Sequence, residues 1–366
     1  MDRRTLLSSV AALSAAALAG CSGEDRTPKT SPSTSPAPTP GPEPDESWSD
    51  LEVVDTVATG LNVPWGIAFL ADGSALVSQR DAASIVRIST TGDVDELGRV
   101  RGLTTGVEAG LMGIAVDPDD EGVLYAFVTT DRDNRVVRMS LDGGTLGRPE
   151  PILTGIAVGG RHHGGRLLFA PDGHLFVATG DAGNGALAQD RSSLNGKILR
   201  ITRDGGAADG NPFDNRVWSY GHRNVEGLAL DADGRLWASE FGEKRADELN
   251  LIEAGGNYGW PQVEGTGGGE GHIDPQATWP TSEASPAGLG ITRSTAFLGA
   301  LQGQCVWAVP LGGERAGKPR RFVEGYGRIR NAVPAPDGSL WVTTSNTDGR
   351  RTADRGDDRI LRAELS

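Results

Sequence analysis

The chain has 366 residues, including 53 glycines and 21 prolines, and carries a formal net charge of −14 at pH 7. Nucleic-acid binding needs basic patches, so this acidic balance argues against a nucleic-acid partner. The two cysteines are Cys21 and Cys305.

Residues 1–21 have the pattern of a bacterial lipoprotein signal peptide. Arg3 and Arg4 precede an apolar stretch from Leu6 to Ala19, and small residues lead to Cys21. The stretch is too short for a comfortable transmembrane helix. We expect cleavage and acylation of Cys21, which would anchor an exported protein to the outer face of the bacterial cell membrane. A short membrane anchor or a fortuitous cysteine is the alternative, and the arginine pair also suits twin-arginine export.

Residues 22–50 are expected to form a disordered tether. They are mostly Ser, Thr, Pro, Gly and acidic residues, a composition that cannot bury a core. If Cys21 is lipidated, Cys305 has no partner. The remaining domain, 51–366, is then expected to fold without disulfides despite an oxidising compartment.

One phrase recurs through residues 51–366: an acidic-glycine turn followed by an alternating strand. Its central aspartates, with a weaker copy in second place, are Asp72, Asp119, Asp172, Asp233 and Asp337. Asp-Gly between apolar strands is a strong hairpin signal. The gaps are 47, 53, 61 and 104 residues, so the last gap hides one decayed copy. We expect it around 291–310, with strands at 297–301 and 305–309.

Most copies are followed by a further strand that carries an arginine, as in Ile85–Ile88 and Ile198–Ile201. Six such units with almost no helical periodicity predict an all-β fold, a six-bladed β-propeller of four-stranded blades. Two stacked sandwich domains are the alternative, but they would not explain a repeat that spans the chain. An early strand, 51–59, should complete the last blade and close the ring. Functional residues are then expected on loops at one channel mouth.

The segment 161–167 is the first candidate for chemistry. It places His162 and His163 on a glycine-rich approach to a strand, and Asp181 follows that region. Histidine is suited to take a proton near neutral pH, and a carboxylate could orient it. A polar turn between two strands is the alternative interpretation.

Two clusters offer arginines. Arg223, beside Asn224, presents a rigid fork of donors to a carboxylate or a developing oxyanion. Arg328 and Arg330 share one face of a strand, and two guanidinium groups on one face suit an anion with several carboxylates or phosphates. A polar turn and a solvated edge strand are the respective alternatives.

Two further clusters offer oxygen ligands or a channel-facing carboxylate. The segments 240–243, 247–250 and 257–260 are rich in oxygen donors and glycine, which suits Ca²⁺; an acidic surface loop is the alternative. Glu108 precedes a small-residue turn and could face the channel. Histidine and cysteine spacings typical of transition metals are absent from the sequence, so zinc is not expected.

Taken in this order, and with the opening phrase Gly60–Trp65, these clusters resemble the soluble pyrroloquinoline-quinone (PQQ)-dependent aldose sugar dehydrogenases and their soluble glucose dehydrogenase relatives. The resemblance covers residue 51 to the C-terminus. It implies a six-bladed propeller with PQQ and Ca²⁺ at one channel mouth. It also favours His162 over His163 as the catalytic base, with Asp181 supporting it.

The resemblance further implies a set of ligand contacts. The residues expected at the quinone are Glu108, Arg223, Asn224, Gln302, Arg328 and Arg330. The backbone carbonyls of Gly242 and Glu243 fall where the family binds its catalytic Ca²⁺. Glu248 and Tyr258 fall at a second, structural Ca²⁺ site.

Four positions depart from the family pattern. Glu108 stands where relatives often carry Gln, and Gln302 where many have a basic residue. Glu243 replaces a common Pro, and Arg161 occupies a position that is acidic and contacts sugar in the glucose enzyme.

The implied reaction is oxidation of an aldose at C1 to the lactone. His162 would act as general base, hydride would pass to the quinone, and Ca²⁺ and Arg223 would stabilise the growing negative charge. The sequence has no haem-attachment motif, so the electron acceptor is expected to be a separate molecule. The alternatives are a Ca²⁺-dependent lactonase-type hydrolase, against which Arg328 and Arg330 count, and a non-catalytic surface propeller that binds glycan or protein.

Overall fold

The computed structural model describes residues 50–142, 144–313 and 316–366. The predicted signal peptide, the acylated Cys21 and nearly all of the predicted tether lie outside these residues. Within them, no helix is long and apolar enough to cross a membrane.

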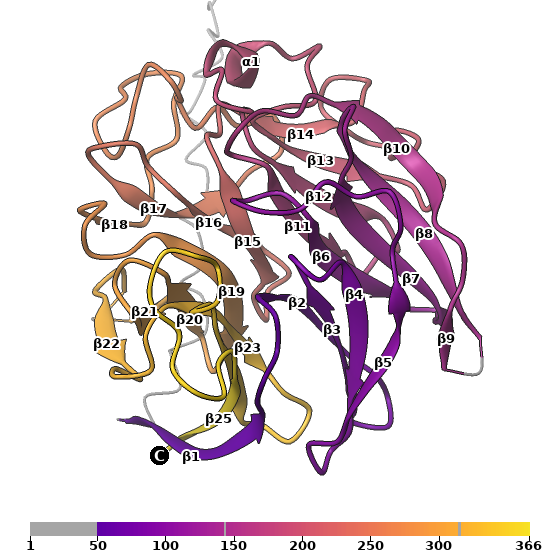
Figure 1. The fold of residues 1–366 in the computed structure, drawn as a ribbon. Coiled ribbons are helices and arrows are strands. Elements are labelled where there is room, and N and C mark those ends of the chain that lie inside the picture. The colour runs from indigo at the N-terminus through magenta and orange to yellow at the C-terminus, as the bar shows by residue number, and fades with distance from the viewer. Residues whose placement is uncertain (1–49, 143, 314–315) are drawn as a thin grey trace, which may run out of the picture. The chain divides into compact units, whose positions relative to one another are not determined.

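The described residues form six sheets arranged around a central axis, a six-bladed β-propeller (Figure 1). The first strands of successive blades contact one another around that axis. The prediction of an all-β propeller with four-stranded blades is confirmed. The second blade carries one additional two-residue strand.

The strands follow in chain order. The first blade contains β2 (Pro64–Phe69), β3 (Ala75–Gln79), β4 (Ser84–Ile88) and β5 (Val94–Arg99). The second contains β6 (Leu111–Asp117), β7 (Asp120–Thr129), β8 (Asn134–Asp142), β9 (Thr145–Leu146) and β10 (Glu150–Ile156). The third contains β11 (Gly164–Phe169), β12 (Leu175–Thr179), β13 (Lys197–Ile201) and β14 (Val217–Tyr220), with the short helix α1 (Ala186–Gln189) between β12 and β13.

The second half continues the pattern. The fourth blade contains β15 (Val225–Leu230), β16 (Leu236–Glu240), β17 (Asp247–Ile252) and β18 (Ala277–Trp279). The fifth contains β19 (Pro286–Thr292), β20 (Thr295–Ala300), β21 (Cys305–Pro310) and β22 (Arg320–Phe322). The sixth contains β23 (Ile329–Pro334), β24 (Leu340–Thr344), β25 (Ile360–Leu365) and β1 (Leu51–Ala58).

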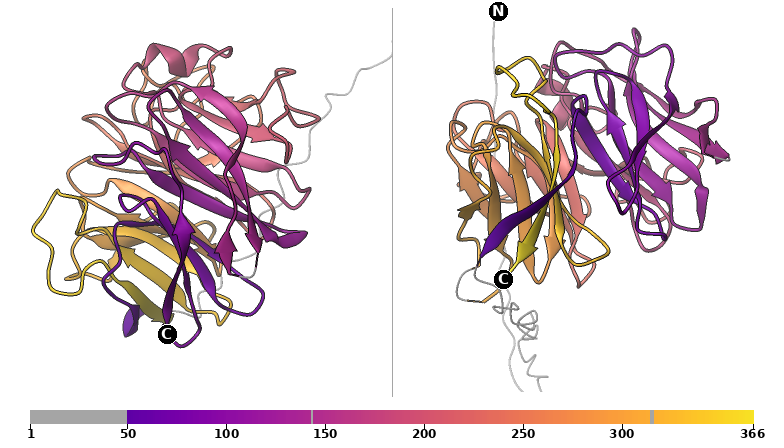
Figure 2. Two further views of the ribbon diagram at one scale, coloured as in Figure 1. Left: turned by 45° about the vertical axis from the view of Figure 1, so that its right-hand side comes forward. Right: turned by 60° about the horizontal axis from the view of Figure 1, so that its bottom comes forward.

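The N-terminal strand closes the ring, as predicted. β1 pairs antiparallel with β25, from Leu51 opposite Leu365 to Ala58 opposite Ile360. Figure 2 shows the indigo strand lying beside the yellow C-terminal strands. The last blade is therefore built from both ends of the domain, and β1 covers the edge of β25 that would otherwise be unpaired.

The recurring Asp-Gly phrase forms the turn between the first and second strands of a blade. In the first blade Gly73 has φ of 82° and donates its N–H to the carbonyl of Leu70. The Asp72 carboxylate accepts the N–H of Ser74 at 2.9 Å. The arginine of the third strand, Arg87, pairs with that same aspartate. The equivalent pairs Arg200–Asp172 and Arg362–Asp337 recur in the third and sixth blades, which explains the arginine in the repeat.

A buried network of polar contacts around Arg166 lies in the channel interior. Arg166 stacks on Trp65, with its guanidinium carbon 4.3 Å from the ring centroid. It donates to the Glu226 carbonyl at 2.8 Å and to the side chain of Asn331 at 2.9 Å. Asn331 in turn donates to the Trp65 carbonyl. These bonds join the inner strands of four blades.

Lys197 is completely buried and holds the segment that carries α1. Its Nζ donates to the carbonyls of Leu187, Ala188 and Asn195 at 2.7, 2.9 and 2.8 Å. Burial lowers the pKa of Lys197 to about 7. The Ala188 carbonyl also accepts the Gly221 N–H at 2.9 Å, so loss of the ammonium affects the carbonyls of Leu187 and Asn195 most.

Replacing Lys197 by methionine is expected to lower the free energy of unfolding by about 3 kcal/mol, because it leaves buried carbonyls without donors. Urea denaturation measures the change, with exposed Lys318→Met as the matched control. Unchanged stability of K197M would mean that the desolvation cost of the ammonium cancels its hydrogen bonds.

Candidate functional site

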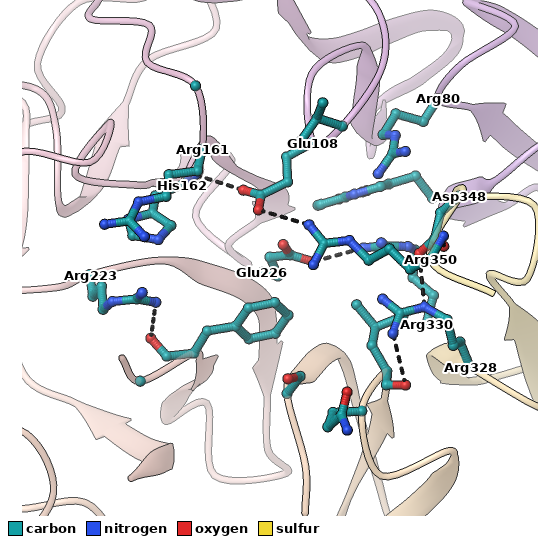
Figure 3. Close-up of a pocket in the computed structure, with 18 residues that line it drawn as sticks. Arg80, Glu108, Arg161, His162, Arg223, Glu226, Arg328, Arg330, Asp348 and Arg350 are labelled. Carbon is teal, nitrogen blue, oxygen red and sulfur yellow. Dashed lines mark hydrogen bonds and ion pairs between the residues drawn. The ribbon is translucent and has the colours of Figure 1, made fainter. Parts of the chain in front are cut away.

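A pocket of about 450 Å³ lies at one mouth of the channel, and all six blades contribute to its lining (Figure 3). The lining residues lie before or at the start of the first strand of each blade and, in the first, fourth, fifth and sixth blades, also after the second strand. The Asp-Gly turns lie at the other end of these strands. Antiparallel connection places the start of one strand beside the end of the next, so one set of loops from each blade meets here.

His162 lines this pocket in a strained backbone conformation. Its φ is 59°, an uncommon value for a residue other than glycine. Its N–H donates to the Glu108 carboxylate at 2.7 Å, which fixes the segment from the neighbouring blade. Gly180 lies so close behind it that a Cβ there would be 1.9 Å from the His162 carbonyl oxygen. The sequence therefore needs glycine at position 180 to seat this histidine.

Asp181 holds the ring of His162. Asp181 Oδ1 lies 2.6 Å from His162 Nδ1, and both side chains are buried. Trp260 donates to Oδ2 at 2.8 Å and the Gly183 N–H to Oδ1 at 2.7 Å. Burial alone would raise the pKa of Asp181, but these bonds, with His162 foremost, lower it below its ordinary value. A carboxylate on Nδ1 favours the tautomer whose Nε2 can accept a proton.

His163 has a different environment. It is buried, and its Nδ1 lies 3.0 Å from Asn134 Oδ1. Burial lowers the pKa of His163. It is not among the residues that line the pocket. The structure therefore brings His162 to the pocket and places His163 in the wall behind it.

Arg223 lines the pocket on the same side as His162 (Figure 3). Its Nη1 donates to the Phe241 carbonyl at 3.1 Å, and among the described residues its buried Nε has no hydrogen-bond partner. Burial lowers the pKa of Arg223. Asn224 lies behind the pocket wall, where its Oδ1 accepts the Gly164 N–H at 2.9 Å. Arg223 therefore faces the pocket, whereas Asn224 supports the backbone behind the pocket wall.

Arg328 and Arg330 lie together on the opposite side of the pocket, as expected for positions i and i+2 (Figure 3). Arg328 donates to Asp348 at 2.9 Å and Arg330 to Glu226 at 2.7 Å. Burial lowers the pKa of both arginines. Each guanidinium has one carboxylate partner and keeps further N–H donors for a ligand.

The two remaining predicted quinone contacts also line the pocket. Glu108 joins its two sides, since it accepts from His162 and lies 3.3 Å from the Arg350 guanidinium. Gln302 follows β20, and its backbone N–H donates to the Ala284 carbonyl at 3.0 Å.

The structure places the predicted calcium residues in two environments. Gly242 lines the pocket, and the Glu243 side chain lies beside it, 4.0 Å from Arg161. Glu248 pairs across the sheet with Glu240. Burial, together with the Glu240 carboxylate, raises the pKa of Glu248 to about 8.

Tyr258 does not share a donor set with Glu248. Its hydroxyl donates to the Leu251 carbonyl at 2.6 Å and accepts the Glu253 N–H at 2.8 Å. Glu248 instead accepts from Gly265 and Asn250. The side chains of Glu248 and Tyr258 thus form no common ligand set in this structure, and a second ion site there stays a prediction.

Six charged or aromatic residues of the pocket were not predicted as site residues from the sequence. They are Trp65, Arg80, Glu226, Phe241, Asp348 and Arg350. Arg80 is buried, and among the described residues its Nη2 has no hydrogen-bond partner. A positional rule would have found four of them, because Arg80, Phe241, Asp348 and Arg350 follow second strands, as Asp181 does.

The pocket lining is strongly cationic. Six arginines face three carboxylates there. Such an excess of guanidinium groups suits a ligand with several carboxylates. The histidine–aspartate pair, which lies opposite Arg328 and Arg330, can remove a proton from a second molecule held beside that ligand.

Comparisons with known proteins agree with this geometry. A family model for glucose/sorbosone dehydrogenases matches residues 61–360. The chain is 29% identical over 341 residues to the aldose sugar dehydrogenase of Escherichia coli, covering 81% of this chain and 91% of that one. It is 30% identical over 249 residues to quinoprotein glucose dehydrogenase B of Acinetobacter calcoaceticus, covering 57% of this chain and 52% of that one.

A solved structure shows the same arrangement of blades. The PQQ-bound aldose sugar dehydrogenase of Streptomyces coelicolor is 50% identical, with a TM-score of 0.84 over 87% of this chain and 98% of that one. Because the family model spans nearly all of the described propeller, the chain belongs to the glucose/sorbosone dehydrogenase family.

Proposed function

We propose that this protein oxidises an aldose sugar at C1 to the lactone, with PQQ as hydride acceptor and Ca²⁺ as a cofactor. One observation carries the proposal: His162, oriented by Asp181, faces the same pocket as Arg223, Arg328 and Arg330. The pocket thus combines a base with a cationic wall. The PQQ-bound relative at 50% identity supports the choice of cofactor.

His162 is the general base of the proposed reaction. Asp181 occupies Nδ1, so Nε2 is available to take the proton from the C1 hydroxyl. The proton goes to His162, and the hydride on C1 leaves with its electron pair, so C1 becomes the lactone carbonyl. When bound, PQQ supplies the electrophilic quinone that accepts this hydride.

The arginines fit the proposed cofactor. Arg328 and Arg330 lie on one wall and can donate to carboxylates, while Arg223 lies near His162 (Figure 3). The guanidinium of Arg223 has an unused buried N–H among the described residues, which can donate to an oxygen that gains negative charge. Arg80 adds a further cation to the pocket lining.

Backbone oxygens of Gly242 and Glu243 would hold the proposed calcium ion. Calcium accepts carbonyl oxygens readily and needs no fixed geometry. Among the described residues, no cluster of three or more His, Cys, Asp or Glu could hold a metal by side chains alone. This donor set disfavours a lactonase-type hydrolase, which would need acidic ligands converging on the channel.

Reconstitution tests the proposal. We expect the purified protein, given PQQ and Ca²⁺, to reduce an artificial dye with at least one aldose from a panel. Chelation with EDTA should remove the activity, and Ca²⁺ should restore it. Protein without added PQQ is the control. No dye reduction across the panel, together with no PQQ binding by titration, would favour a non-catalytic propeller instead.

A further inference from the structure

The loop between β16 and β17 wraps around a single carboxylate oxygen. Glu264, from the long connection between β17 and β18, accepts four successive backbone N–H groups on Oε1. The donors are Glu243, Lys244, Arg245 and Ala246, at 2.6, 2.8, 2.8 and 3.2 Å. Four bonds to one charged oxygen fix the course of this loop far more than the usual single bond does.

The preceding residue is held in the same way by a second carboxylate. The Gly242 N–H donates to Asp247 Oδ1 at 2.9 Å. The other oxygen of Asp247 accepts the Ser285 N–H from the next blade at 2.6 Å. Five successive amides, 242–246, therefore all point at carboxylates.

The directions of these N–H groups also fix the directions in which the carbonyl groups of the loop point. The peptide bonds of this loop are trans, so each carbonyl points opposite to the N–H of the next residue. The N–H groups of Glu243 and Lys244 point to Glu264. The carbonyls of Gly242 and Glu243 must therefore point away from Glu264. Gly242 itself lines the pocket.

The loop also leaves no room for a side chain at position 242. A Cβ at Gly242 would lie 2.0 Å from the Ala246 carbonyl oxygen and 2.7 Å from Glu264 Oε1.

We infer that Glu264 is a positioning residue, whose carboxylate orients the carbonyl oxygens of Gly242 and Glu243 for a cation at the pocket. This inference rests on the proposed function, since it concerns the proposed calcium ligands. Glu264 is not among the residues that line the pocket, and its Oε1 accepts hydrogen bonds from the loop residues 243–246.

The test compares Glu264→Gln and Glu264→Ala with Glu270→Gln, an exposed glutamate on the same connection. Hydrogen–deuterium exchange of the full chain without ligands is followed over residues 242–247. We expect E264A to exchange at least about tenfold faster there, E264Q to fall between, and E270Q to match the wild type.

Calorimetric titration with Ca²⁺ in the presence of PQQ is the second readout. E264Q should raise the calcium dissociation constant about tenfold or more, while KM for the sugar at saturating Ca²⁺ stays unchanged. Unchanged exchange in E264A, or faster exchange with unchanged calcium affinity, would overturn the inference. If wild type and E270Q bind no Ca²⁺ either, the proposed function fails instead, and the positioning role falls with it.

Discussion

Replacing His162 by alanine is expected to lower kcat about 10³-fold while the protein still binds PQQ. General-base catalysis by a positioned side chain contributes about 10²–10⁴-fold, and the contacts of His162 with Asp181 and Glu108 fix its position. The arginines on the opposite wall are untouched by the substitution. Steady-state dye reduction measures kcat, and the absorbance of the bound quinone reports the cofactor.

His163→Asn is the matched control for this prediction. His163 is the adjacent histidine and is equally buried, and among the described residues its ring contacts the Asn134 side chain. We expect its kcat to fall by less than about tenfold, through packing alone. A fully active His162→Ala variant, or an equal loss in both variants, would remove His162 from its role as base.

The blade count was predictable because turn chemistry repeats more faithfully than strand sequence. In the Asp-Gly turns, one carboxylate accepts a backbone N–H and the following glycine takes a positive φ, as at Asp72 and Gly73. These demands are local, so they appear in the sequence at regular spacing. The closing strand was predictable for a related reason, since the last blade has only three strands from the C-terminal part of the chain and β1 supplies the fourth.

The turn of the fifth blade was not recognised in the sequence, because residues other than Asp and Gly adopt its positive φ values. β19 and β20 are joined at Arg293 and Ser294, with φ values of 46° and 51°. A two-residue hairpin turn requires such positive φ values, usually supplied by Asn or Gly. Only the doubled spacing indicated the missing unit, and strands β20 and β21 lie where that spacing placed them.

The site was predicted less completely, because its contacts join distant segments. The resemblance implies that Asn224 lies at the quinone. Here its side chain accepts the Gly164 N–H behind His162, and a contact with the quinone stays a prediction. Glu226 pairs with Arg330 across 104 positions of sequence. Glu264 approaches its loop from a connection with no regular structure. No local pattern encodes these partners, since the ring closure alone decides which loops meet.

Replacing Arg328 and Arg330 together by alanine is expected to raise the PQQ dissociation constant about 10³-fold. A hydrogen bond to a charged group contributes about 1.5–3 kcal/mol, and each tenfold change in affinity corresponds to about 1.4 kcal/mol. The two guanidinium groups share one pocket wall, so both can donate to carboxylates of one anion. Absorbance titration of the protein with PQQ at fixed Ca²⁺ measures the effect.

The double variant also leaves Asp348 and Glu226 without their arginine partners. The resulting change in stability must be separated from the change in PQQ affinity. Glu226 is buried beside Arg330, so removing that arginine should destabilise the fold as well. Arg328→Gln alone avoids this, because it keeps a donor near Asp348, and should raise the dissociation constant about tenfold or more. Exposed Arg101→Ala, outside the pocket, is the control. If R328Q binds PQQ as tightly as R101A does, this wall of the pocket does not hold the cofactor, and its arginines serve the fold alone.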